Sequence, residues 1–151
     1  MAYRAGVEQR ISLVTLGVAD VERAKRFYQA LGWRGREAEG TVFLSAGAVT
    51  VVLWGGEKLA DDAGLPAGDS GFGGIALAQN VRSREEVDAV LADAVHAGAT
   101  VTQPARETFY GGYAGYFTDL DGHAWEIAYN PGFTLGPDGS IAIPEHFGTE
   151  I

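Results

Sequence analysis

The segment Leu16–Trp33, LGVADVERAKRFYQALGW, joins the end of an expected strand to a complete amphipathic helix. The run Ile11–Val18 is rich in β-branched and apolar residues, which predicts a strand. Asp20 offers an N-cap for the helix, and Gly32 can end it because glycine adopts the left-handed conformation without a Cβ penalty. The apolar residues between these two recur at helical spacing: Val21, Ala24, Phe27, Tyr28 and Leu31.

Three short strand-like runs follow the helix. They are Trp33–Ala38, Thr41–Ser45 and Ala48–Trp54, separated by short turns that contain glycine. The next stretch, Gly55–Ser70, is polar and turn-rich, so we expect a linker with at most one short helical turn.

The same order of elements then begins again. Phe72–Gln79 has the composition of a strand, and Ser83 with Glu86 has the spacing of a capping box that opens a second helix ending at Gly98. Three more strands are expected, with the turn Asp119–Gly122 before the last: Thr100–Arg106, Tyr113–Asp119 and Ala124–Asn130. The chain therefore contains a duplicated βαβββ module.

This order predicts an α+β fold in which two βαβββ modules pair into a curved mixed sheet around a cleft. The 151 residues fit a single domain. We divide it into a first module at about 8–55, a linker at 56–70, a second module at about 71–131 and an irregular tail at 132–151. Sites commonly form at such internal interfaces, so the inward side chains of the strands are the candidates for function.

Charge and composition narrow the classes of partner. Eleven Lys and Arg against twenty Asp and Glu give a net charge of −9, which disfavours nucleic acid and anionic membrane surfaces. The sequence has no cysteine, which excludes disulfides, zinc–thiolate sites and thiol nucleophiles. We expect no membrane span and, with no signal-peptide core at the N-terminus, a cytoplasmic location.

Two motifs carry a family resemblance. The first is V-x-D-x6-F-Y, from Val18 to Tyr28, and the second is D-x-D-G-H-x-W-E, from Asp119 to Glu126. With the order of elements, they make residues 8 to 133 similar to the vicinal oxygen chelate superfamily, which includes glyoxalase I, extradiol dioxygenases, and fosfomycin and bleomycin resistance proteins. The resemblance implies a glyoxalase/bleomycin resistance/dihydroxybiphenyl dioxygenase-like fold and, for many members, a homodimer with shared cavities. It is less specific for activity, because the fold hosts both enzymes and binding proteins.

The resemblance also implies where a divalent metal would be held. The family's four ligand positions correspond here to Leu13, to the run Val51–Trp54, to Gly74 and to Glu126. Only Glu126 can ligate, whereas such sites generally need three or more protein ligands. We therefore expect no metal and no other cofactor.

Glu126 is the only catalytic candidate, as a general base, and it could equally pair with a cationic ligand or bond a backbone amide or a threonine. The candidate ligand-binding residues are those expected to line the cleft or its aromatic rim: Leu13, Thr15, Thr50, Val52, Trp54, Phe72, Gly74, Ala76, Tyr110, Tyr113 and Glu126. Aromatic rings at a cleft mouth can stack planar or cationic ligands. We expect His123 to complete its turn by bonding to backbone.

These observations favour a metal-free protein that binds a small aromatic or cationic molecule in its cleft, as in bleomycin-resistance-like sequestration. The alternative is a glyoxalase/lyase- or dioxygenase-type enzyme that uses Glu126 as base or metal ligand. A third possibility is a regulatory module whose cleft is filled by its own side chains. The expected partners are a small-molecule ligand and a second copy of the chain.

Overall fold

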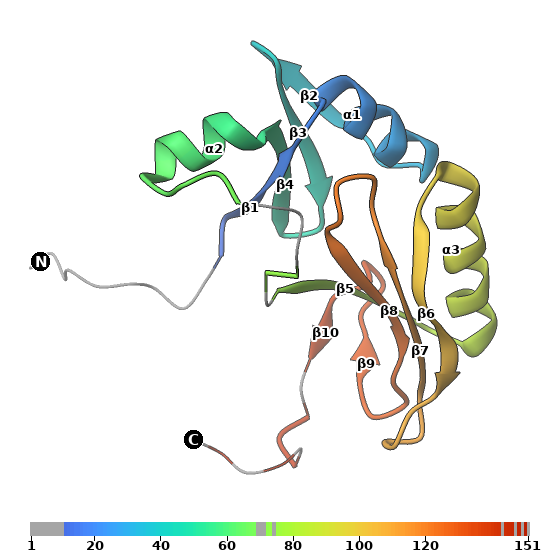
Figure 1. Cartoon of the computed structure of the whole chain (residues 1–151). Helices are drawn as coiled ribbons and strands as arrows, with labels where there is room; N and C mark the ends of the chain where they lie inside the picture. The colour runs from blue at the N-terminus through green and yellow to red at the C-terminus, as the bar shows by residue number, and fades with distance from the viewer. Residues whose placement is uncertain are drawn as a thin grey trace, which may run out of the picture.

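The computed structural model describes residues 11–68, 72–73, 75–142, 144–146, 148 and 150 (Figure 1). The first module contains five elements in chain order, followed by a further helix: β1 (Leu13–Val18), α1 (Val21–Ala30), β2 (Gly35–Ala38), β3 (Thr41–Ala46), β4 (Val49–Gly55) and α2 (Gly56–Ala63). Its four strands form a mixed sheet in the order β1-β4-β3-β2, with β1 parallel to β4 and the other pairs antiparallel.

The second module repeats this arrangement. Its elements are β5 (Ala76–Val81), α3 (Arg84–Ala97), β6 (Thr100–Glu107), β7 (Tyr113–Thr118) and β8 (Ala124–Tyr129). They form a sheet in the order β5-β8-β7-β6, again with one parallel pair at β5 and β8. The α+β class and the duplicated βαβββ module are therefore confirmed. In the described part of the chain no strand pair joins the two sheets.

Local signals explain where α1 and α3 begin and end. The Asp20 carboxylate accepts the N–H of Arg23 at 3.1 Å, and the Ser83 hydroxyl accepts the N–H of Glu86 at 3.1 Å. The Glu86 carboxylate in turn accepts the N–H of Arg82 at 2.8 Å. Each cap satisfies backbone donors that the first helical turn leaves without a partner. Gly98 ends α3 with φ of 111°.

Three sequence predictions about the elements are wrong. The stretch predicted as a linker contains α2, a helix of eight residues, which packs where Leu59 lies over Gly17 of β1. The strand predicted at Phe72–Gln79 begins only at Ala76 and runs to Val81, because its bounds follow its pairing with β8. The tail is not wholly irregular, since β9 (Thr134–Leu135) and β10 (Ile141–Ala142) form a short antiparallel pair.

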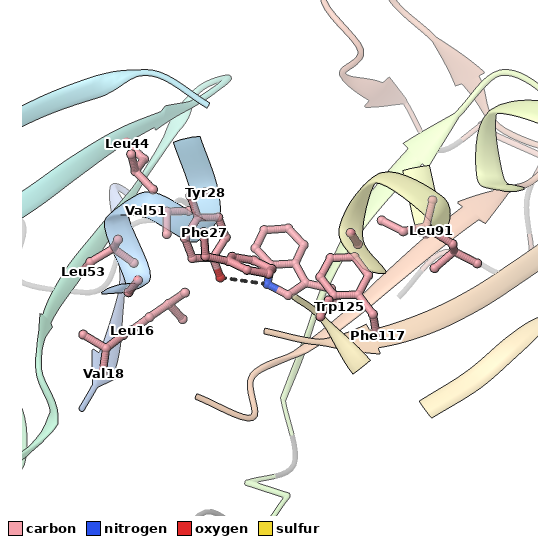
Figure 2. Packing of buried hydrophobic residues seen from close by; sticks show 14 of the residues in the cluster. Leu16, Val18, Phe27, Tyr28, Leu44, Val51, Leu53, Leu91, Phe117 and Trp125 are labelled. Atoms are coloured by element: carbon pink, nitrogen blue, oxygen red, sulfur yellow. Dashed lines mark hydrogen bonds between the residues drawn. The ribbon is translucent and has the colours of Figure 1, made fainter. Parts of the chain in front are cut away.

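The core lies between the helix and the sheet of each module and continues across the junction of the two modules. Helix α1 covers one side of the first sheet, α3 covers one side of the second, and α2 lies on the other side of the first sheet (Figure 1). The buried residues of both modules form one cluster, in which Tyr28 of α1 meets Trp125 of β8 with ring centroids 6.2 Å apart (Figure 2). Within the second module, Gly115 of β7 allows α3 to pack closely on the sheet, because a Cβ there would lie 2.7 Å from Leu91 of α3 and 3.0 Å from the Ala105 backbone of β6.

This packing determines which surfaces remain open. Side chains alternate along a strand, so each sheet presents its other face away from the shared core. None of the described helices combines the length and the apolarity that a membrane crossing requires.

Candidate functional site: two carboxylates of the β7–β8 hairpin

The hairpin formed by β7 and β8 carries a carboxylate on each side of the second sheet. Asp119, at the end of β7, is 6% exposed and faces the first module, whereas Glu126 in β8 is half-buried on the face that points away from α3. Trp125 and Ile127, the neighbours of Glu126 in β8, are both buried in the core. The alternation of side chains along β8 therefore separates Glu126 from the apolar interior.

Glu126 is held by one tyrosine on the outward face. The hydroxyl of Tyr116 in β7 donates to the Glu126 Oε2 at 2.8 Å, and the two residues are direct cross-strand partners. This hydrogen bond is the main reason why the pKa of Tyr116 is raised above its ordinary value. Among the described residues, no Lys, Arg or His forms an ion pair with Glu126. The pair is thus an oriented carboxylate that is available to an external cation.

Tyr116 was not among the predicted site residues. From the sequence, the carboxyl of Glu126 was expected to act as a base, to pair with a cationic ligand, or to bond a backbone amide or a threonine. The register of the hairpin identifies Tyr116 as the neighbour of Glu126, because a turn that pairs Thr118 with Ala124 also pairs residue 116 with residue 126.

The first sheet brings five predicted site residues onto its own outward face. These are Leu13 and Thr15 of β1 and Thr50, Val52 and Trp54 of β4, which the pairing of β1 with β4 places in adjacent rows. Phe43 of β3 continues the row that contains Thr15 and Val52. Leu13 is 48% exposed and Phe43 is 38% exposed, so this face presents apolar and aromatic groups to its surroundings.

The remaining predicted residues are distributed over the molecule. Ala76 lies on the same face of the second sheet as Glu126, and Tyr110 lies at the tip of the β6–β7 hairpin. Tyr113 is on the opposite face from Glu126, because its hydroxyl donates to the Asp88 carboxylate of α3 at 2.8 Å. Phe72 is 78% exposed in the segment before β5. Gly74 lies outside the described residues.

A cavity of about 860 Å³ lies between the modules. Thr15, Phe72 and His123 line it, together with Glu57 and Lys58 in the first turn of α2. Of the predicted ligand-binding residues, the cavity therefore brings together only Thr15 and Phe72 within the described part of the chain. Glu126 does not line it.

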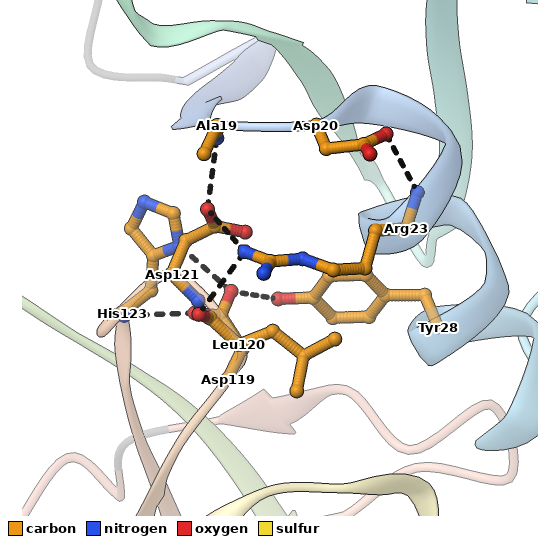
Figure 3. A network of polar contacts seen from close by, with 8 residues as sticks. All are labelled: Ala19, Asp20, Arg23, Tyr28, Asp119, Leu120, Asp121 and His123. Atoms are coloured by element: carbon orange, nitrogen blue, oxygen red, sulfur yellow. Dashed lines mark hydrogen bonds and ion pairs between the residues drawn. The ribbon is translucent and has the colours of Figure 1, made fainter.

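Beside this cavity, Asp119 connects the two modules through its carboxylate (Figure 3). The Asp119 Oδ2 accepts the hydroxyl of Tyr28 at 2.7 Å and lies 2.7 Å from the Nδ1 of His123. The Oδ1 accepts the backbone N–H groups of Asp121 and His123, each at 2.9 Å. His123 was expected to bond to backbone within the turn, whereas its ring pairs with this buried carboxylate.

A second aspartate strengthens the same connection. The Asp121 Oδ1 accepts the backbone N–H of Ala19 at 2.8 Å and lies 3.4 Å from the Nη2 of Arg23 (Figure 3). Asp119 therefore fixes the β7–β8 turn to α1, and Asp121 fixes it to the junction between β1 and α1. This network makes the D-x-D-G-H motif an inter-module clamp.

The clamp shifts the pKa values of its members. Burial raises the pKa of Asp119, but hydrogen bonds from His123 and Tyr28 outweigh it, so the pKa lies below the ordinary 3.8. The hydrogen bond to Asp119 raises the pKa of His123 above 6.5, assisted by a backbone hydrogen bond to Gly17. Burial beside Asp119 raises the pKa of Tyr28 far above its ordinary value, so this hydroxyl stays a donor.

The donor set does not fit the divalent metal that the resemblance implies. In the described ranges, no group of three or more His, Asp or Glu side chains converges in a metal-binding arrangement. Of the four family positions, Leu13 and the Val51–Trp54 run offer no ligand, and Glu126 supplies a single carboxylate. One carboxylate and one tyrosine hydroxyl are too few for the Zn²⁺, Mn²⁺ or Fe²⁺ sites that proteins build.

The fold and these sites define an α+β protein made of paired βαβββ modules with an oriented glutamate on an open sheet face. The family model of the Glyoxalase/Bleomycin resistance protein/Dioxygenase superfamily matches residues 10–127, so the chain belongs to this superfamily. No protein with a curated description matches the chain.

Solved structures agree with this assignment. A glyoxalase-related enzyme from Fulvimarina pelagi is 36% identical with a TM-score of 0.83, over 90% of this chain and 99% of that one. Lactoylglutathione lyase from Agrobacterium tumefaciens is 19% identical, with a TM-score of 0.61 over 81% of this chain and 94% of that one. A fosfomycin resistance protein from Mesorhizobium loti is 23% identical, with a TM-score of 0.61 over 83% and 94%. The last two show a common fold alone.

The clamp predicts a pH-dependent stability. Because the pKa of His123 is raised on folding, its contribution is complete below about pH 6.5 and is lost as the pH rises through the folded-state value. At about pH 6, His123→Gln should lower the free energy of unfolding by about 1.5–3 kcal/mol, the range for hydrogen bonds to charged groups. Denaturant unfolding from about pH 6 to pH 9 should show the difference from wild type shrinking with pH.

Asp119 contributes at low pH. Because the pKa of its carboxyl is lowered on folding, it stabilises the folded state above about pH 3.8 and loses this effect as the pH falls. A difference between wild type and His123→Gln that stays constant with pH would contradict the clamp.

Proposed function

We propose that the protein binds a small aromatic or cationic molecule at the Glu126–Tyr116 pair without transforming it. The observation that supports this most directly is the Glu126 carboxylate, which is oriented by Tyr116 and forms no ion pair with any described residue. A partly desolvated carboxylate attracts a cation more strongly than one in bulk water. The net charge of −9 adds a negative electrostatic field, which also attracts a cation.

A second copy of the chain would complete the site. Within one chain, no strand pairing joins the two sheets in the described residues, and the hydrogen-bond partner of Glu126, Tyr116, belongs to the same sheet as Glu126. The first sheet of another copy could form the opposite side of the cleft, with Leu13, Phe43 and Trp54 on its outward face. Burying these groups would contribute the apolar area that a stable interface requires.

Sequestration is supported over catalysis by the chemistry of the donors. A lyase or dioxygenase of this superfamily would act through a divalent metal, and Glu126 with Tyr116 does not supply the ligands for one. The superfamily includes bleomycin resistance proteins. Binding of a toxic cationic compound is therefore the activity that we propose.

Glu126→Gln tests the binding site. With ethidium and bleomycin as probes, the neutral amide should weaken binding by about 1.5–3 kcal/mol, or roughly 10- to 150-fold, because a charged hydrogen bond is lost. Isothermal titration calorimetry measures the change. Glu85→Gln, which removes an exposed carboxylate of α3, is the matched control and should bind like wild type. Equal affinities for both variants would remove Glu126 from the site.

The oligomeric state tests the shared cleft. Light scattering coupled to size exclusion should give the mass of two chains for wild type. Phe43→Lys places a charge on the outward face of the first sheet and should give one chain, because an unpaired charge in an apolar interface is costly. Phe109→Lys is the control, since Phe109 is fully exposed at the tip of the β6–β7 hairpin. A monomeric wild-type protein would contradict the proposal.

Metal content separates binding protein from enzyme. After incubation with Mn²⁺, Fe²⁺, Ni²⁺ or Zn²⁺ and desalting, we expect less than about 0.1 ion per chain, since stable sites need three or more ligands. Elemental analysis of the untagged protein gives the ratio. About one tightly held ion per chain that disappears in Glu126→Gln would favour the enzyme.

A further inference from the structure

A bulge in β6 determines which face of the second sheet carries Arg106. Gln103 pairs with Tyr116 of β7 and Arg106 pairs with Ala114, so three residue steps in β6 lie opposite two steps in β7. In a regular strand, Ala105 would lie opposite Ala114, and the side chain of Arg106 would point to the helix side. The bulge adds one residue and turns Arg106 onto the outward face instead.

The residues around the bulge agree with this orientation. Glu107, the next residue in β6, accepts two hydrogen bonds from the Arg84 guanidinium of α3, at 3.0 and 3.1 Å, so it points to the helix side. Alternation along the strand leaves Arg106 on the opposite face. The bulge also fits against Gly115 of β7, because a Cβ at Gly115 would lie 3.0 Å from the Ala105 backbone. The orientation of Arg106 is therefore part of the packed structure.

Two opposite charges consequently share the outward face without pairing. Glu126 is the cross-strand partner of Tyr116, and Arg106 is that of Ala114, two residues away along β7. From the spacing of strands and the rise per residue, the Cα atoms of Arg106 and Glu126 lie about 12 Å apart. Arg106 is exposed, and in the described ranges neither of these two side chains forms an ion pair. Both charges are thus available to a third molecule.

An exposed aromatic ring lies near these charges. The pKa of Tyr116 is raised mainly by its hydrogen bond to Glu126, and the Tyr110 phenol is near enough to add a smaller contribution. The Tyr110 ring packs on the backbone of Gly112, because a Cβ there would lie 2.6 Å from a ring carbon. Thr108 holds this hairpin tip, since its hydroxyl accepts the Gly112 N–H at 2.9 Å. Tyr110 is 39% exposed and therefore offers a positioned ring to an organic ligand.

We propose that the ligand bound at Glu126 is a zwitterion, whose cationic group pairs with Glu126 and whose carboxylate pairs with Arg106. This inference rests on the proposed function, to which it adds Arg106 as the residue that determines specificity. A guanidinium binds a carboxylate through two parallel hydrogen bonds. A ligand with cationic groups alone would leave Arg106 unpaired or bring like charges together, so this face favours a molecule that carries both charges.

Three related probes test the two charges. 4-(Aminomethyl)benzoate carries an ammonium and a carboxylate at opposite ends of one ring, benzylamine carries only the ammonium, and 4-methylbenzoate carries only the carboxylate. In ¹⁵N–¹H NMR titrations at pH 7, the zwitterion should bind wild type about tenfold more tightly than benzylamine, because it gains a charged hydrogen-bonded contact with Arg106. It should likewise bind more tightly than 4-methylbenzoate, which has no group for Glu126.

Arg106→Gln separates this inference from the proposed function. The variant should bind the zwitterion no more tightly than benzylamine, because the carboxylate has lost its partner, while benzylamine should bind within about twofold of wild type. Arg26→Gln removes an exposed arginine of α1 as the matched control and should keep the tenfold preference. Glu126→Gln should weaken the zwitterion and benzylamine alike. Since Arg106 is exposed, its variant should melt at the wild-type temperature.

Equal affinity of wild type for the zwitterion and benzylamine would overturn the inference. A preference that Arg106→Gln retains would overturn it as well, since the carboxylate would then bind elsewhere. In both cases, weaker benzylamine binding by Glu126→Gln would leave the proposed function standing. A preference that is lost in Arg106→Gln, together with benzylamine binding that Glu126→Gln leaves unchanged, would instead overturn the proposed function and keep only the carboxylate contact at Arg106.

Discussion

The buried carboxylate of Asp119 is the constraint on which the arrangement of the two modules depends. A charge with 6% exposure costs free energy unless hydrogen bonds replace its lost hydration. Among the described residues, Asp119 has four such contacts, of which only the Tyr28 hydroxyl comes from the first module. The three contacts within the turn hold the carboxylate in place. The fourth comes from α1, so the carboxylate keeps its full set of hydrogen bonds only while α1 stays in position.

The same hairpin contains a second carboxylate with the opposite environment. Asp119 is surrounded by donors from its own turn and from α1, whereas Glu126, seven residues later, has the Tyr116 hydroxyl and an open sheet face. The alternation of side chains along β8 produces this contrast, because the clamp and the core occupy one side of the sheet. A group whose hydrogen bonds are completed internally stabilises a fold, whereas a group left partly unpaired can recognise a ligand.

Local signals made the two helices and the duplicated module predictable from sequence. Asp20 and Ser83 cap their helices through contacts only three residues away. Helix α2 was not predicted because it begins at Gly55–Gly56 without a capping side chain, and its place depends on Leu59 packing over Gly17, 42 residues earlier in the chain. The start of β5 likewise depends on pairing with β8, which no local pattern specifies.

For the candidate site, the alternation of side chains along each strand predicted which residues share a face of a sheet, but nothing more. Parity correctly grouped Leu13, Thr15 and Val52 on one face of the first sheet. It could not assign Tyr113, because Gly111 and Gly112 allow the chain before β7 to turn toward either face, and the Asp88 partner belongs to a different element.

The position of the core explains why Glu126 and the buried aromatic rings lie on opposite sides of the second sheet. Because the modules associate through their helix sides, the aromatic residues of α1 and its C-terminal turn are brought against those of β7 and β8. Curved sheets and helices do not fill this junction completely, and a cavity of about 190 Å³ remains among the rings. The same association leaves Glu126 on the outer face, so the aromatic rings of the junction are used in packing within the chain, whereas the carboxylate faces away from the core.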